Sequence, residues 1–141
     1  MDANKEMSMR IGIVALAAAG LVGGVTTVVA QQPTFTRTVL QQADISVPGR
    51  EAVTAVVVFQ PGGSPGRHTH PGEEIGYVLE GTVLIEQDGK PAVTLDAGKT
   101  FLIPSGTVHN ATNSGSTVAR LLVSYIVEKG KPLATPAAAR N

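Results

Sequence analysis

The chain contains no cysteine and no tryptophan. The lack of cysteine excludes disulfide bonds, thiolate metal sites, cysteine nucleophiles and a lipid-modified N-terminal cysteine. Aromatic residues make up only 4% of the 141 residues, so a core must be built mainly from Val, Ile, Leu and Ala. The 11 basic residues balance the 11 acidic ones, and without a basic patch we expect no nucleic-acid partner. The length allows a single domain.

One long uncharged segment stands near the N-terminus, at residues 11–30. Lys5 and Arg10 precede it, and Val28-Val29-Ala30 places small residues where a signal peptidase reads. We therefore predict a secretory signal at residues 1–30, cleaved after Ala30. An uncleaved membrane anchor is the alternative, because twenty residues can just span a bilayer. Either way the domain is expected outside the cytoplasm, periplasmic or secreted.

The rest of the chain is typical of an all-β fold. Short β-branched runs alternate with turn signals such as Asp88-Gly89, a pattern that predicts a sandwich or closed barrel at residues 31–131. The predicted strands are Thr36–Ala43, Glu51–Gln60, Glu74–Leu79, Thr82–Gln87, Ala92–Leu95, Thr100–Ile103, Thr107–Thr112 and Thr117–Val127. The Pro/Ala-rich residues 132–141 are predicted to be a disordered tail.

The chain has three histidines, His68, His70 and His109. In a strand, His68 and His70 point the same way, about 7 Å apart at Cα, and can converge on one ion. Pro71-Gly72 then turns the chain and brings Glu74 beside them, while His109 comes from a later strand. Three imidazoles and a carboxylate suit Fe, Mn, Ni, Cu or Zn better than Ca or Mg. Taken singly, a His-x-His pair is more often a polar surface pair, and a lone glutamate a solvated turn residue.

Two spaced motifs resemble those of the cupin superfamily. They read Gly62-x5-His68-x-His70-x3-Glu74-x6-Gly81 and Gly98-x5-Pro104-x-Gly106-x2-His109-x3-Asn113. With the flanking strands, the resemblance covers about residues 36–127. It implies a six-stranded jelly-roll barrel with one divalent metal inside, held by His68, His70, Glu74 and His109, and two coordination positions left for water or substrate. It also implies a homodimer, through the Thr36–Ala43 or the Thr117–Val127 strand.

Strand alternation predicts the neighbours of this site. Small or apolar side chains are expected inward, at Gly76, Val78, Thr107 and Ala111. Glu73 and Tyr77 are expected outward, the latter at the surface or in an interface. Asn113 most simply closes a turn, and the motif glycines Gly62, Gly81, Gly98 and Gly106 are expected at turns. The alternation does not fix which way Phe59, Phe101, Arg120 and Tyr125 face.

A metal with open positions in such a barrel allows several functions. The expected apolar lining and the lack of a second inward acid–base pair favour chemistry done by the metal itself, and we therefore expect a quercetin dioxygenase-like oxygenase acting on a small aromatic or enolic compound. A non-catalytic module that binds or senses a small ligand is the alternative, as is a Lewis-acid lyase, isomerase or decarboxylase. A metal-free epimerase of the same fold fits poorly, because those proteins replace the ligand set.

Overall fold

The computed structural model describes residues 34–138, which form strands and no helix. No segment in this range is a helix long and apolar enough to cross a membrane. The proposed export segment lies outside the described residues. The strands are β1 (Phe35–Asp44), β2 (Arg50–Phe59), β3 (His68–Thr69), β4 (Gly72–Glu80), β5 (Thr82–Gln87), β6 (Val93–Asp96), β7 (Thr100–Ile103), β8 (His109–Asn113), β9 (Ala119–Glu128) and β10 (Thr135–Pro136).

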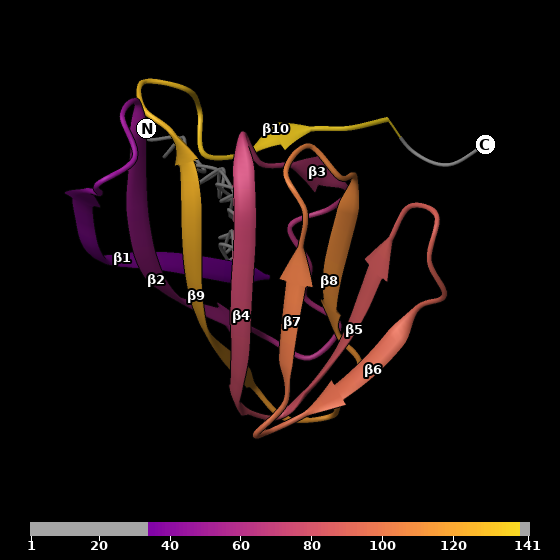
Figure 1. Cartoon of the computed structure of the whole chain (residues 1–141). Helices are drawn as coiled ribbons and strands as arrows, with labels where there is room; N and C mark the ends of the chain where they lie inside the picture. Colours follow the sequence, from indigo (N-terminus) through magenta and orange to yellow (C-terminus); the bar gives the residue numbers. More distant parts are fainter. Residues whose placement is uncertain (1–33, 139–141) are drawn as a thin grey trace, which may run out of the picture. The chain divides into compact units, whose positions relative to one another are not determined.

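The strands form two five-stranded antiparallel sheets (Figure 1). Sheet 1 has the order β1-β2-β9-β4-β7, and sheet 2 has the order β10-β3-β8-β5-β6. This all-β, two-sheet arrangement is consistent with the predicted jelly roll. The observed bounds agree with those of the predicted strands to within two residues, and the two short strands β3 and β10 were not predicted.

The core lies between the sheets because alternate residues of each strand face inward. In β2 the inward set includes Val53, Ala55 and Val57, and in β9 it includes Leu121 and Val123, all at most 5% exposed. β2 and β9 pair along their full length, so the two inward rows form one continuous apolar surface. Burying each of these valine and leucine side chains contributes about 1.5–3 kcal/mol.

One prediction about the edges of the fold needs correction. The segment Thr117–Val127 corresponds to β9, which is paired on both sides with β2 and β4. Its backbone groups are already used in the sheet, so it offers no edge for a partner. The β1 strand does lie at the edge of sheet 1.

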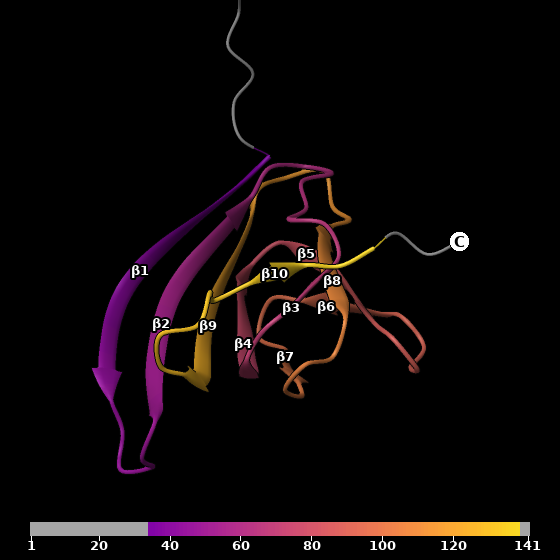
Figure 2. The ribbon, with the colours of Figure 1, turned by 90° about the horizontal axis from the view of Figure 1, so that it is seen from above.

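The predicted disordered tail is ordered in its first part. Thr135–Pro136 forms β10, which pairs with His68–Thr69, and the Ala137 N–H donates to the Arg67 carbonyl at 2.9 Å. Figure 2 shows β10 beside β3, crossing the middle of the domain as seen from above. Pairing by main-chain groups requires no particular side chains, so the composition of the tail did not indicate it.

Candidate metal centre

Four buried side chains meet between the two sheets. His68 lies on β3, His109 lies opposite it on β8, and Glu74 lies on β4 of the other sheet. His70 follows β3 directly. All four are between 3% and 8% exposed, and one nitrogen or oxygen atom of each lies within 4.8 Å of those of the others. The structure therefore brings together the four residues that the sequence predicts as metal ligands.

The carboxylate of Glu74 lies close to two of the imidazoles. Its Oε2 is 3.0 Å from His70 Nε2 and 2.9 Å from His109 Nε2. The ring of His68 completes the group, with centroids 4.8 Å from His70 and 4.4 Å from His109. Atoms of two sheets thus surround one small volume.

Each imidazole is oriented by a main-chain carbonyl. Nδ1 of His68 lies 2.7 Å from Gly66 O, and Nδ1 of His109 lies 2.9 Å from Thr107 O. Nδ1 of His70 lies 2.5 Å from Leu133 O. A carbonyl oxygen only accepts, so each Nδ1 carries the proton, and in the neutral ring each Nε2 presents a lone pair. Such bonds orient metal-ligating histidines in proteins.

The atoms that face the centre of the cluster fit a cation. His70 Nε2, His109 Nε2 and Glu74 Oε2 are buried and have no hydrogen-bond partner of suitable geometry. Lone pairs and a carboxylate about 3 Å apart repel one another unless a proton or a metal lies between them. A buried set of three nitrogens and one carboxylate oxygen suits a first-row divalent metal such as Fe, Mn, Ni, Cu or Zn.

The protonation states support ligation. Burial lowers the pKa of His68 to about 4, so this ring is neutral at neutral pH. Burial raises the pKa of Glu74, but the His109 and His70 imidazoles beside its Oε2 outweigh burial and lower the pKa to about 2. A neutral imidazole and an ionised carboxylate are the forms that bind metal.

Comparison with known proteins identifies the family. The family model described as a cupin domain matches residues 55–125, half of the chain. The chain belongs to the cupin family. Oxalate oxidase 2 of Hordeum vulgare is 39% identical over 77 residues, covering 49% of this chain and 34% of that protein. The HTH-type transcriptional regulator PuuR of Escherichia coli is 33% identical over 79 residues, covering 55% and 42%.

Solved structures agree with this assignment. An oxalate oxidase in complex with the substrate analogue glycolate has a TM-score of 0.59 and 28% identity, covering 75% of this cupin and 56% of that chain. A double-stranded β-helix protein from Klebsiella pneumoniae has a TM-score of 0.61 at 22% identity, which supports the fold alone. The chain spans about a third of the length of the oxalate oxidases and germin-like proteins that it matches.

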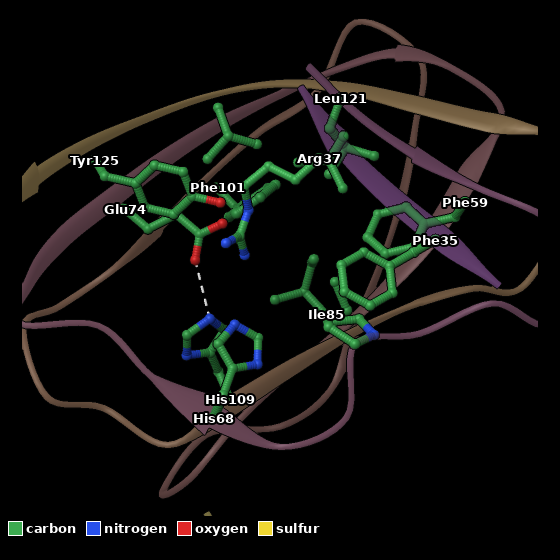
Figure 3. Close-up of a pocket in the computed structure, with 14 residues that line it drawn as sticks. Phe35, Arg37, Phe59, His68, Glu74, Ile85, Phe101, His109, Leu121 and Tyr125 are labelled. Atoms are coloured by element: carbon green, nitrogen blue, oxygen red, sulfur yellow. Dashed lines mark ion pairs between the residues drawn. The ribbon is translucent and has the colours of Figure 1, made fainter. Parts of the chain in front are cut away.

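A small cavity adjoins the cluster of this cupin (Figure 3). Its free volume is about 20 Å³, room for about one water molecule. A second, outer hollow of about 170 Å³ shares four of its lining residues. The shared residues are Phe35, Arg37, Pro65 and His68.

Of the four residues whose direction the sequence left open, three line the cavity and one faces outward. Phe59, Phe101 and Tyr125 line the inner cavity. Burial, reinforced by the nearby Glu74 carboxylate and opposed by Arg37, raises the pKa of the Tyr125 hydroxyl, which therefore stays protonated at neutral pH. Arg120 instead faces outward, with its Nε 3.2 Å from the Glu80 carboxylate.

The predicted faces of β4 are confirmed. Gly76 and Val78 are buried, whereas Tyr77 is 43% exposed. Glu73 also faces outward, 4.0 Å from Arg50. Ala111 lines the cavity; Thr107 is not in the lining, and its contribution is the carbonyl that accepts from His109.

Asn113 has the structural role that the sequence predicts. Its Nδ2 donates to Phe59 O at 3.2 Å and to Thr117 O at 2.7 Å, and its Oδ1 accepts from Gly115 N at 2.9 Å. The motif glycines also lie at turns, with φ between 70° and 88°. They are Gly62, Gly81, Gly98 and Gly106.

Sequence reasoning missed Arg37. This residue of β1 points into the cavity, toward Glu74 and the histidines (Figure 3). Its guanidinium carbon lies 5.5 Å from the centroid of the Tyr125 ring. The available signal was a single charged residue within the predicted strand Thr36–Ala43. Strand alternation did not show which face this residue lies on, because the neighbouring Val39 and Leu40 are both apolar and both are exposed.

Proposed function

We propose that this cupin is a metal-dependent enzyme of the oxygenase type that acts on a small aromatic or enolic compound. One observation carries the proposal. The four candidate ligands His68, His70, Glu74 and His109 meet beside a cavity lined mainly by aromatic and aliphatic side chains. Glu74 is the only carboxylate among the residues that line it, so no second acid is placed there for general acid–base work.

The side chains around the cluster have definite tasks in this proposal. The four ligands hold the metal, which supplies redox or Lewis-acid chemistry when bound. Phe35, Phe59 and Leu121 give the cavity an apolar wall that excludes water. The protonated hydroxyl of Tyr125 offers a hydrogen-bond donor to a substrate oxygen.

The relatives support an enzyme of this kind. Oxalate oxidases are among the proteins with both sequence and structural similarity to this chain. The inner cavity, at about 20 Å³, admits only the part of a compound nearest the metal, and the rest would lie in the outer hollow of about 170 Å³. The similarity to oxalate oxidases leads us to place small organic compounds ahead of flavonols as substrates.

Metal analysis and oxygen uptake test the proposal together. Protein purified from its native host should carry about one Fe, Mn, Ni or Cu per chain and consume oxygen only with a substrate from a panel of small enolic and catecholic compounds. Glu74→Gln should lower metal occupancy at least tenfold, because loss of a ligand to a closed site removes much of the binding free energy. Glu73→Gln is the matched control, since its carboxylate faces outward. Equal occupancy in the two variants would refute the ligand assignment.

A ligand-sensing module is the second candidate. The similarity to the transcriptional regulator PuuR favours it. Zinc in the site, with ligand binding but no oxygen uptake, would support sensing. Product formation without oxygen uptake would instead support a Lewis-acid lyase, isomerase or decarboxylase.

We also propose that the protein is exported and forms a homodimer. Residues 11–30 support export, and N-terminal sequencing of exported protein should begin near Gln31. The edge position of β1 and its exposed Val39 and Leu40 support self-association through this strand. Sedimentation should give a dimer, and a monomer at micromolar concentration would contradict this.

A further inference from the structure

We infer that Arg37 selects the substrate of this site, and that the substrate is a small organic anion whose carboxylate binds the Arg37 guanidinium while a neighbouring oxygen reaches the metal. The inference deepens the proposed function and rests on it, because the anion is placed relative to a metal held by the four ligands. Arg37 Nε is buried and has no hydrogen-bond partner among the described residues.

An unpartnered guanidinium donor is costly to bury. Leaving a charged donor unsatisfied costs more than leaving a neutral one, and buried charges are normally paired. Figure 3 shows the guanidinium directed into the cavity, on the same side as the Glu74 carboxylate. A ligand in the cavity is therefore in reach of the free donor. A carboxylate is the acceptor that matches the guanidinium fork in both shape and charge.

The charges around the cavity also require an anion. Among the residues lining the inner cavity and the outer hollow, Glu74 is the only carboxylate. A divalent metal (+2), Arg37 (+1) and Glu74 (−1) leave a net charge of +2. The other arginine of the outer hollow, Arg67, is already paired with Asp88 at 2.7 Å. A ligand with one or two negative charges would therefore balance the site.

The position of Arg37 defines where the anionic group lies. Arg37 lines both the inner cavity of about 20 Å³ and the outer hollow of about 170 Å³. The inner cavity has room for about one water molecule, and so for one or two donor atoms of a ligand. The rest of the ligand must lie in the outer hollow. Its carboxylate, bound at the junction, is then close to the oxygen that enters the inner cavity, as in a 2-hydroxy or 2-oxo acid or its enol.

A purely structural role for Arg37 makes a different prediction. The guanidinium lies over the Tyr125 ring, and a cation–π contact of this kind contributes to stability. If that were its whole role, replacing Arg37 would lower stability without changing which ligands bind. A selective role changes the preference between charged and neutral ligands, and so the two roles are separable.

Calorimetric titration of the full chain loaded with Zn²⁺ tests the inference. Zinc is redox-inert, so binding is measured independently of oxygen uptake. Two matched probe pairs differ in charge: glycolate with glycolamide, and 2,3-dihydroxybenzoate with catechol. In the wild type, the anion of at least one pair should bind about 10- to 100-fold more tightly than its partner, the range expected of a charge-assisted bond.

Three variants complete the test. Arg37→Gln should reduce the preference by about threefold or more, although the metal still attracts an anion, and Arg37→Lys, which keeps the charge, should lose less of the preference. Arg120→Gln, on the outer face, should match the wild type, and circular dichroism should show that all variants fold.

An unchanged preference in Arg37→Gln, or no preference or no binding in the wild type, would overturn the inference alone. Failure to bind Zn²⁺ would overturn the proposed function and the inference with it.

Discussion

Acid should destabilise the metal-free protein, because His68 binds a proton in the unfolded chain more readily than in the folded one. Burial lowers its pKa from 6.5 to about 4. Between these pH values the unfolded chain holds a proton at this residue that the folded chain does not, so the free energy of unfolding falls as the pH falls. At about 1.4 kcal/mol per pH unit, the full loss is about 3 kcal/mol. Roughly 2 kcal/mol of it develops between pH 7 and pH 5.

Protonation of Glu74 lowers the free energy of unfolding a second time, at lower pH. Burial would raise its pKa, but the His109 and His70 imidazoles beside its Oε2 lower the pKa from 4.5 to about 2. The folded chain therefore releases this proton more readily, and the resulting stability, present above pH 4.5, is lost as the pH falls toward 2. The two steps are separated in pH, so the first can be measured alone.

Urea denaturation of the chelator-treated chain at pH 5, 6 and 7 measures the first step. His68→Gln keeps a polar side chain of similar length and removes the titration. We expect the variant to lose about 2 kcal/mol less than the wild type between pH 7 and pH 5. Equal losses in the two proteins would show that His68 does not titrate below its ordinary range and would refute the reasoning.

Three further predictions concern packing around the site. A Cβ at Gly72 would lie 1.9 Å from the Ile126 carbonyl oxygen, so Gly72→Ala must separate β4 from β9 and should lower the free energy of unfolding by about 3 kcal/mol or more in urea denaturation. A Cβ at Gly76 would lie 2.1 Å from the Phe101 ring. Gly76→Ala should push this ring into the cavity and weaken ligand binding in calorimetry, while one metal per chain is retained. Asn113→Ala removes three hydrogen bonds to the main chain and should lower the thermal midpoint, with a loss of about 3 kcal/mol.

The parts of the site that could be predicted from the sequence are those that local geometry determines. The alternation of a strand gives the faces of Gly76 and Tyr77 once Glu74 is placed inward. The spacing of the two motifs brings His68 and His109 opposite each other because each segment is bounded by turns that only a few residue types allow. Strand alternation and turn formation each depend on only a few neighbouring residues, so both can be predicted from a single sequence.

The parts that could not be predicted depend on contacts between distant segments. Which face of β1 turns inward is decided by its register with β2, and the apolar Val39 and Leu40 obscure it. The acceptor for His70 Nδ1 is the main-chain carbonyl of Leu133. Every residue has such a carbonyl, so no side chain in the tail marks this one.

These two unpredicted segments have a common consequence for the function. The cupin match covers residues 55–125 and contains all four candidate metal ligands, whose spacing is constrained by the geometry of one ion. The entrance to the site is formed largely outside that range, by Phe35 and Arg37 of β1, by Ala134 and by Pro136 of β10. Nothing about the metal constrains these positions, so they can change with the ligand while the centre stays the same. Similarity in the matched range therefore identifies the family, whereas the substrate selection that we propose rests on the two flanking segments, in which Arg37 has a buried Nε without a hydrogen-bond partner.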